Sequence, residues 1–544
     1  MDQVVPLLVA IPLAGGFLIP VIGRLTKSHR ATAILPILMA CGVLVIAVVL
    51  LARPDETVVY WMGGWTFPIG ISLVADGLSK LVVLVIAVIS VLTLLFSLEY
   101  MTHYTSPGLY YGLFMLMLAG MIGVVISGDI FNIFVFLEIA GIASYALVAY
   151  GTESDELEAS FKYLVLSAIA SAFILVGVAF VYNVTGQLNW AKIAEVIRTG
   201  GGLTVPLYVA AAFFIMGFGL KAAVVPFHAW LPDAHPSAPA PISAMLSGVL
   251  IKACGVYVLC RLAFSVLGNH QTFGTVLVVL GTLSMVLGAL MAVGQGDLKR
   301  LLAYSSISQV GYVVAAVGAG LVGLALAKDS KPLAVASEFA VFGGLFHLMN
   351  HAVFKSLLFL CSGSIEQATG TRQLDRLSGL GRRMPVTGWS LRVGALAISG
   401  VPPFGGFWSK LIIIVALAQL AALAHWAFYI PAALAVATAV VTLVYYAKVQ
   451  RLVLGGEPSD AAQGAREVPA AMCVASVVLA VLCLASALVI LPSVRSRLVD
   501  PAVRVLSAAA GPAAEPVTAR AAPDRGQVGT PGAAQVAAKE GTTP

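Results

Sequence analysis

Apolar runs long enough to cross a lipid bilayer recur along most of this chain, and no other feature limits its fold so strongly. A transmembrane helix needs about 20 consecutive, mostly apolar residues. We expect about fourteen spans, which makes the chain an all-α polytopic membrane protein. They are 4–23, 31–52, 78–98, 109–127, 130–150, 162–182, 205–225, 241–264, 273–294, 301–325, 338–363, 388–419, 425–448 and 468–491.

The composition supports lipid as the main solvent. Of the 544 residues, 60% are hydrophobic and only 10% are charged, against about 25% charged residues in an ordinary soluble domain. So few charges cannot cover a water-facing surface, so we expect the lipid bilayer as a partner. The net charge of +6, without any run of basic residues, gives no support for nucleic-acid binding.

The two ends of the chain carry separate signals. The first apolar run follows Asp2 without a basic segment, so we interpret it as a transmembrane helix and not as a signal peptide. From Pro501 onward Ala, Pro, Gly and Thr dominate, which predicts a disordered tail. We therefore divide the chain into helices 1–3 (1–100), a core (101–450), the last helix (451–500) and the tail (501–544).

Basic residues in the loops predict the orientation, because cytoplasmic loops carry an excess of Lys and Arg. With the N-terminus outside, twelve basic residues lie in inner loops: Arg24, Lys27, Arg30, Lys299, Arg300, Arg372, Arg376, Arg382, Arg383, Lys448, Arg451 and Arg466. The outer loops then hold six: Arg53, Lys192, Arg198, Arg261, Lys328 and Lys331. We expect a multi-pass protein of a bacterial or archaeal inner membrane with its N-terminus outside.

The cysteines give no sign of a metal or cofactor site. The six are Cys41, Cys254, Cys260, Cys361, Cys473 and Cys483. All lie in apolar runs and none forms a CxxC pair, so we interpret them as small buried hydrophobic residues. The sequence predicts no metal, no cofactor and no redox centre in this chain.

Ionisable residues inside the spans are the best candidates for function, because a charge at the bilayer centre costs about 2.5–3.5 kcal/mol or more. Glu138 lies nine residues past Asp129 in the fifth span, and Lys221 lies in the seventh with Pro226 behind it. Burial favours a neutral lysine and a nearby carboxylate favours a charged one, so Lys221 could load and release a proton. A permanent Glu138–Lys221 salt bridge is the structural alternative.

Lys252 and three residues of the eleventh span extend this set. Lys252 has apolar or small residues on both sides, and snorkelling to an interface is its alternative. His347, His351 and Lys355 follow each other at steps of four, which places them along one helix face. They fit a proton relay, with metal binding or simple helix packing as alternatives.

Lys410 completes the set in a span that Pro402 and Pro403 interrupt. Its alternative role is to cap the broken helix through backbone carbonyls. Six further residues give weaker signals: Asp76, Asp129, His228, His235, Glu338 and Arg392. Lys221 and Lys410 each adjoin a broken helix, in the seventh and twelfth spans, and an offset of five predicts two inverted repeats over spans 4–8 and 9–13.

Five stretches give the chain a clear family resemblance: DIFNIFVFLEIAGIASYALVAY, KAAVVPFHAWLPDAHPSAPAPISAMLSGVLIKACGVY, QGDLKRLLAYSSISQVGYV, HLMNHAVFKSLLFLCSGSI and GVPPFGGFWSK. The chain resembles the antiporter-like subunits of respiratory complex I, the multi-subunit Na+/H+ antiporters and the membrane-bound hydrogenases. The resemblance implies fourteen helices with two inverted five-helix repeats. It also implies a Glu138–Lys221 pair, a central Lys252, a His347/His351 relay with Lys355 beside it, and a terminal Lys410.

The resemblance implies a proton-translocating subunit of a multi-subunit complex. Its partners would be other membrane subunits and peripheral redox subunits that drive it, as in complex I or hydrogenase-like complexes. The main alternative is a D-type component of a multi-subunit Na+/H+ antiporter without redox coupling. A quinone-binding redox subunit and a membrane scaffold are weaker alternatives, since we find no cofactor ligands and a scaffold has no use for so many mid-membrane lysines.

Overall fold

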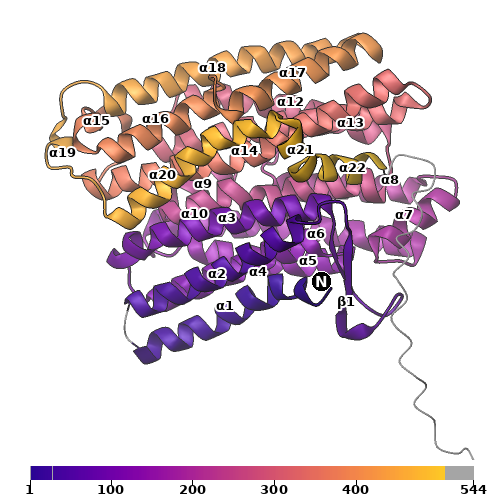
Figure 1. Ribbon diagram of the computed structural model, residues 1–544, viewed down its shortest axis with the longest axis horizontal. Helices are drawn as coiled ribbons and strands as arrows, with labels where there is room; N and C mark the ends of the chain where they lie inside the picture. The colour runs from indigo at the N-terminus through magenta and orange to yellow at the C-terminus, as the bar shows by residue number, and fades with distance from the viewer. Residues whose placement is uncertain (1, 27–28, 509–544) are drawn as a thin grey trace, which may run out of the picture. The chain divides into compact units, whose positions relative to one another are not determined.

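The chain folds almost entirely into helices, most of which run side by side (Figure 1). The computed structural model describes residues 2–26 and 29–508. The longer helices are α1 (Leu7–Thr26), α2 (His29–Leu51), α3 (Gly77–Tyr100), α4 (Pro107–Ile126), α5 (Ile130–Val148), α6 (Ser154–Thr185), α8 (Val205–Lys221), α12 (Gln271–Val293), α13 (Leu298–Ala327), α14 (Lys331–Thr369), α16 (Pro385–Ser399), α17 (Gly405–Leu423), α18 (Tyr429–Leu454) and α20 (Ala470–Ala485).

Shorter elements connect these helices. The short helices are α7 (Trp190–Thr199), α9 (Leu231–Ser237), α10 (Ala240–Met245), α11 (Val258–Cys260), α15 (Leu380–Arg383), α19 (Asp460–Gln463), α21 (Pro492–Leu498) and α22 (Asp500–Ala508). Single 3₁₀ turns are η1 (Asp2–Val4), η2 (Met62–Gly64), η3 (Met101–His103), η7 (Leu374–Arg376), η8 (Trp426–Phe428) and η9 (Ser486–Ile490). The strands are β1 (Val58–Trp61) and β2 (Ser72–Ala75).

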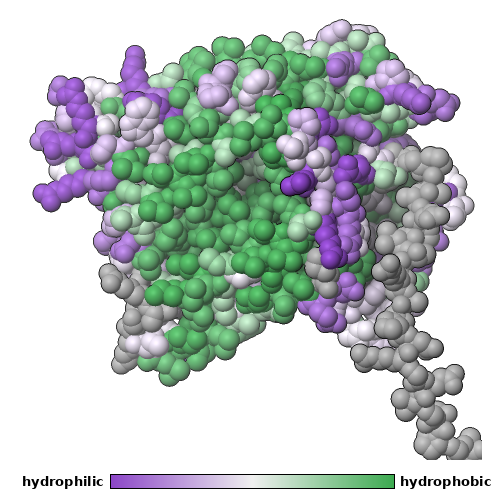
Figure 2. Space-filling model, in the orientation of Figure 1, coloured by the Kyte–Doolittle hydropathy of each residue, from purple (hydrophilic) through white to green (hydrophobic). Residues whose placement is uncertain are grey.

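The predicted class, an all-α polytopic membrane protein, is confirmed. Among the described residues, 13 helices are long and apolar enough to cross a membrane. A further apolar helix, Val205–Lys221, is shorter than a full span because it ends at the predicted break, so the count of fourteen stays a prediction. Figure 2 shows a broad hydrophobic surface between hydrophilic ends, as expected for a protein surrounded by lipid.

Two helices are interrupted where the sequence places prolines. Helix α8 ends at Lys221, and residues 222–230, including Pro226, separate it from α9. Helix α16 ends at Ser399, and residues 400–404, including Pro402 and Pro403, separate it from α17. In each half the interrupted segment packs against a long helix, α8 against α6 and α17 against α14. This correspondence agrees with an inverted repeat, which stays a prediction.

The span Ala240–Val266 is buried at every residue except Ser265 and contains π-helical turns. They are η4 (Leu246–Leu250), η5 (Lys252–Tyr257) and η6 (Arg261–Val266). π-helical turns widen a helix locally and occur often at functional sites. Lys252 is the first residue of one such turn.

One end of the bundle, which we call the hairpin end, carries a feature that the sequence analysis missed. Strands β1 and β2 pair antiparallel, with Val58 opposite Ala75. Helix α22 packs against α3 at this end, with Pro501, Val503 and Leu506 buried. The prediction of a disordered tail from Pro501 is therefore wrong for residues 501–508, because their apolar side chains find a packing surface. Residues 509–544 lie outside the described residues.

We call the opposite end the pocket end. Loops and helix termini around residues 100–105, 150–159, 232–238, 297–300 and 366–373 surround a cavity of about 1210 Å³ there. Basic residues from α13 and from the segment after α14 gather at this end. In the predicted orientation it faces the cytoplasm.

Candidate functional site: a buried line of ionisable residues

Glu138 and Lys221 form the first pair. Lys221 Nζ lies 4.0 Å from Glu138 Oε1, with 5% of the lysine side chain and 33% of the glutamate side chain exposed. Each group has its own serine on α6: Lys221 donates a 2.5 Å hydrogen bond to Ser167 Oγ, and Ser171 donates a hydrogen bond to Glu138 Oε1. Tyr145 also donates to Ser167. The two charges are therefore close but held separately.

Lys252 and Lys355 are joined by a path through two serines. Lys252 donates to the Ser247 carbonyl oxygen at 2.5 Å, and the hydroxyls of Ser247 and Ser306 lie 2.7 Å apart. Ser306 donates to the Leu302 carbonyl oxygen, which also accepts from Lys355 at 2.6 Å. Lys252 is therefore not snorkelling: only 2% of it is exposed.

Lys355 has two further partners, Ser305 and Tyr446. It donates to Ser305 Oγ at 2.5 Å and lies 3.5 Å from the Tyr446 hydroxyl. The Ser305 and Tyr446 hydroxyls are themselves 2.8 Å apart. Two hydroxyl groups and one backbone carbonyl oxygen therefore surround the amino group of a lysine that is fully buried.

His347 and His351 lie parallel on α14, with ring centroids 6.4 Å apart and an interplanar angle of 4°. Both ring nitrogens of His347 have partners: Nδ1 lies 2.9 Å from Ser409 Oγ and Nε2 lies 3.2 Å from Gln309 Oε1. His351 is also fully buried, and both of its ring nitrogens lack a hydrogen-bond partner among the described residues.

Lys410 lies next to the histidine pair, because the preceding residue, Ser409, contacts His347. Lys410 Nζ donates to the Ile398 carbonyl oxygen at 2.7 Å, near the end of α16, and lies 5.1 Å from the ring centroid of Tyr312. The capping contact that the sequence analysis gave as an alternative is thus present. The carbonyl end of a helix is electronegative, so the Lys410 side chain is a suitable cap for α16.

The structure therefore gathers the seven predicted residues into three groups: Glu138 with Lys221, Lys252 with Lys355, and His347 with His351 and Lys410. His351 lies one turn from both His347 and Lys355 on α14, which places it between the second and the third group. Transfer between groups requires water or side-chain motion. The serines that connect them were not predicted, because a serine in an apolar helix gives no sequence signal of its own.

The weaker candidates differ in position: two are helix caps and Glu338 is exposed, whereas His228 is half-buried and His235 is fully buried. Asp76 and Asp129 accept backbone hydrogen bonds at the first turns of α3 and α5. Asp76 also forms a buried ion pair with Arg261. Glu338 is exposed on α14, and Arg392 stacks on Trp389. Among residues 2–26 and 29–508, no group of three His, Cys, Asp or Glu side chains is arranged to hold a metal ion.

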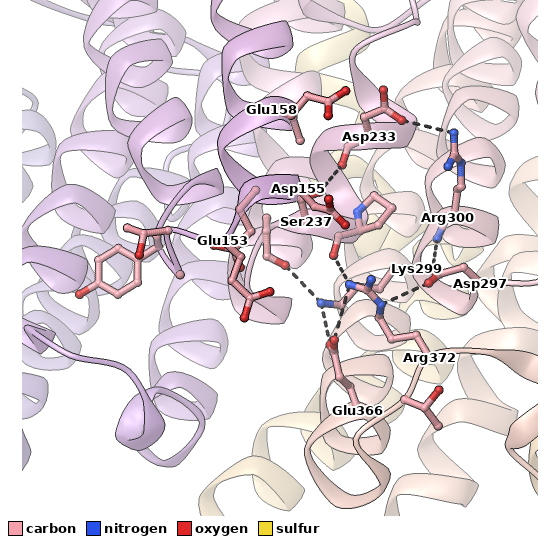
Figure 3. A pocket seen from close by; sticks show the side chains of 18 of the residues that line it. Glu153, Asp155, Glu158, Asp233, Ser237, Asp297, Lys299, Arg300, Glu366 and Arg372 are labelled. Carbon is pink, nitrogen blue, oxygen red and sulfur yellow. Dashed lines mark hydrogen bonds and ion pairs between the residues drawn. The ribbon is translucent and has the colours of Figure 1, made fainter. Parts of the chain in front are cut away.

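The pocket end holds a second polar cluster (Figure 3). Buried Lys299 lies 2.8 Å from Glu366 Oε2, and Arg372 bridges Glu366 and Asp297 at 3.5 and 3.2 Å. Nearer solvent, Asp233 pairs with Lys162 and Arg300 at 3.2 and 3.3 Å. Four helices thus meet through ion pairs around the cavity.

The fold and this buried line define a class of membrane subunit, and comparison with known proteins shows the family. The sequence profile described as "NADH:quinone oxidoreductase/Mrp antiporter, TM" matches residues 127–328 and 331–435. A second, "NADH-Ubiquinone oxidoreductase (complex I), chain 5 N-terminus", matches residues 61–111. The chain belongs to this family of antiporter-like membrane subunits, and the predicted resemblance is confirmed.

Individual relatives come from different complexes. The chain is 33% identical to the N subunit of NADH-quinone oxidoreductase from Desulforudis audaxviator, covering 86% of this chain and 88% of the relative. It is 32% identical to the D subunit of the Na(+)/H(+) antiporter from Alkalihalophilus pseudofirmus, covering 84% and 88%. Hydrogenase-4 component B of Escherichia coli is 34% identical over 77% of this chain and 62% of its own length.

Two solved structures share the fold. A chain of the archaeal membrane-bound sulfane sulfur reductase complex has a TM-score of 0.80 and 33% identity, covering 93% of this chain and 100% of that chain. A chain of the Mrp complex from Dietzia sp. DQ12-45-1b has a TM-score of 0.81 and 26% identity, covering 93% and 98%. The relatives are therefore subunits of multi-subunit membrane complexes.

Proposed function

We propose that this chain translocates protons within a multi-subunit membrane complex, through Glu138, Lys221, Lys252, His347, His351, Lys355 and Lys410. One observation carries the proposal: three lysines and two histidines lie in the centre of the bundle with at most 3% of each residue exposed, namely Lys252, Lys355, Lys410, His347 and His351. Without a role, each buried lysine would be a cost of several kcal/mol.

The first step uses the Glu138–Lys221 pair as an electrostatic switch. At 4.0 Å the carboxylate supports the charged form of Lys221 without a direct hydrogen bond. Protonation or displacement of Glu138 removes that support, so the lysine passes its proton toward Lys252. A change of about two pKa units is worth roughly 2.7 kcal/mol, comparable with about 2.3 kcal/mol for one charge moved through 100 mV.

The serine path carries the proton onward from Lys252 to Lys355. The Ser247 and Ser306 hydroxyls can pass a proton between them, because a hydroxyl group both donates and accepts. Both lysines donate to backbone carbonyl oxygens, which only accept, so a water molecule must connect each lysine with the nearer hydroxyl. The parallel histidines then lead to Lys410 at the second helix break. In the proposed orientation, with the N-terminus outside an inner membrane, Lys410 serves release of the proton to the outside.

Glu138 also supports the proposal that another membrane subunit packs here. Its carboxylate borders a cavity of about 420 Å³ between α5 and α6, next to exposed Ile142. A carboxylate that faces lipid is expensive. A partner subunit that covers this groove would remove that cost and could act on the switch directly.

Redox partners are the proposed driving force, since the N subunit of a quinone oxidoreductase and a sulfur reductase chain are both similar over most of their length. The second candidate, a D-type component of a Na+/H+ antiporter, is supported by the comparable similarity to such a component. Purification in mild detergent followed by mass spectrometry tests the choice. Iron–sulfur, flavin or nickel subunits are expected, whereas only small antiporter subunits would replace redox drive by cation exchange.

A further inference from the structure

The side chain of His235 is the most unusual polar group outside the line described above. It is fully buried, and neither ring nitrogen has a hydrogen-bond partner among the described residues. An unsatisfied polar group in a protein interior costs about 1–3 kcal/mol. Packing alone would be served better by phenylalanine, because the ring contacts Phe359 at a centroid distance of 5.2 Å and Trp230 at 6.3 Å.

The position of His235 relates the pocket end to the central lysines. It lies on α9, where the residues directly after it, Pro236, Ser237 and Ala238, line the pocket. On its other side the ring contacts Phe359 on α14 at a centroid distance of 5.2 Å, and Lys355 Nζ lies 5.9 Å from the centroid of that same phenylalanine. The histidine therefore stands between the polar cavity and Lys355, which belongs to the Lys252–Lys355 group.

Lys299 and Glu366, which line the pocket, lie next to the backbone that follows His235. Lys299 is 2% exposed, and its ammonium group donates to the Ala238 carbonyl oxygen at 3.2 Å while it pairs with Glu366 at 2.8 Å. Figure 3 shows Lys299, Glu366 and Arg372 pointing toward one another beneath Ser237. Arg372 donates to the Pro236 carbonyl oxygen. Lys299 and Arg372, which both pair with Glu366, thus hydrogen-bond the backbone directly after His235.

We propose that the pocket is the entrance for protons and that His235 transfers them from the Lys299–Glu366 pair to the central lysines. This inference rests on the proposed function and names the residues that deliver protons to the buried lysines. A proton held at the Glu366–Lys299 pair moves through intervening water to one ring nitrogen of neutral His235 and gives an imidazolium, because neither ring nitrogen has a direct partner among the described residues. The other nitrogen releases its proton to neutral Lys252 or Lys355, which leaves a neutral imidazole and a charged lysine.

Two variants separate a transfer role from a structural one. His235→Phe keeps the ring packing and removes no hydrogen bond, so a purely structural histidine predicts normal proton flux. Lys299→Met/Glu366→Gln removes both charges together, which avoids an unpaired buried lysine. Matched controls are His425→Phe, in an exposed loop, and Glu457→Gln, an exposed carboxylate at the same end that does not line the pocket.

The experiment measures proton flux in proteoliposomes under a potassium diffusion potential set with valinomycin. They contain the full chain purified with its accompanying membrane subunits, and pyranine reports the internal pH. We expect His235→Phe and the double variant each to lower the flux at least tenfold, with both controls within twofold of wild type and all unfolding temperatures similar.

Glu138→Gln in the same assay distinguishes the two proposals. If it loses flux while His235→Phe and the double variant conduct normally, the entrance is wrong and the proposed function stands. If Glu138→Gln also conducts normally, the proposed function fails and the entrance fails with it.

Discussion

The ammonium group of Lys221 lies 4.0 Å from Glu138 Oε1, and each of the two groups is held by a different serine, Ser167 or Ser171, one turn apart on α6. Two opposite charges in an apolar bundle would be expected to form a direct hydrogen-bonded pair. Here two serines of α6 hydrogen-bond Lys221 and Glu138 separately, so a small movement of this helix would change the distance between the two charges. We regard α6 as the element that controls the Glu138–Lys221 switch.

The serine beside Glu138 gives the first prediction. Ser171→Ala removes the hydrogen bond to the carboxylate, and a hydrogen bond to a charged group is worth about 1.5–3 kcal/mol. We expect proton flux in proteoliposomes to fall about tenfold, because Glu138 then spends more time protonated or paired with Lys221. Ser160→Ala is the matched control, since Ser160 lies on the same helix and donates only to the Tyr145 carbonyl oxygen. Equal flux in both variants would show that α6 does not set the switch.

The path between Lys252 and Lys355 gives the second prediction. Ser306→Ala breaks the contact with the Ser247 hydroxyl while leaving both lysines in place. We expect about tenfold slower proton flux, a loss comparable to that of one hydrogen bond between neutral groups, which is worth about 0.5–1.5 kcal/mol. Ser308→Ala, a buried serine of the same helix that donates to the Met285 carbonyl oxygen, should conduct normally. Unchanged flux in Ser306→Ala would exclude this path.

Much of the buried line could be predicted, and the reasons for the rest are physical. Lys252 and Lys355 stand in long apolar runs, so their burial follows from the sequence; the structure leaves 2% and 0% of them exposed. Their connection could not be predicted, because it passes through Ser247 and Ser306 from helices distant in sequence. A serine in an apolar helix gives no sign of its hydrogen-bond partners in the sequence, because those partners lie on other helices.

The hairpin and the start of the tail escaped prediction for a related reason. Strands β1 and β2 lie between the second and third spans, where a long run of mixed residues reads only as a loop. Helix α22 is only nine residues long, and it is ordered by the surface of α3, against which its apolar side chains pack. Its buried Pro501 packs directly against Gly77, a contact between opposite ends of the chain.

The orientation is the third prediction. A cysteine in place of Glu158, whose side chain is 66% exposed at the pocket end, should react with a membrane-impermeant maleimide only in inside-out vesicles. A cysteine in place of Lys192, 42% exposed on α7, should react only in intact cells. The native cysteines give the background, since all six are buried or half-buried. The reverse labelling pattern would place the N-terminus inside.

The fourth prediction concerns stability at the hairpin end. Arg261 and Asp76 form an ion pair with 2% and 9% of their side chains exposed. Arg261→Gln leaves the carboxylate buried and unpaired, which should lower the free energy of unfolding by about 3–5 kcal/mol. Arg504→Gln breaks an exposed pair with Asp55 and should cost less than about 1 kcal/mol. Thermal unfolding in detergent measures both, and equal losses would contradict the structural role of Arg261.

The pH dependence of that pair follows from the same contacts. Burial raises the pKa of Asp76, but the Arg261 guanidinium and the hydrogen bonds at the start of α3 outweigh it and hold the pKa below its ordinary value. A carboxyl group with a lowered folded-state pKa stabilises the protein above its unfolded-state pKa and loses that effect as pH falls through the folded-state pKa. The stability difference between wild type and Arg261→Gln should therefore stay constant between about pH 6 and 8 and shrink in acid.

Proton transport by Glu138→Gln tests the central claim most directly. The substitution keeps the size of the side chain and the contact with Ser171 but removes the charge that supports Lys221. The assay is proton uptake by proteoliposomes that contain the complex, under an imposed membrane potential. The account predicts at least a tenfold loss with an unchanged unfolding temperature. Transport at the wild-type rate would contradict it.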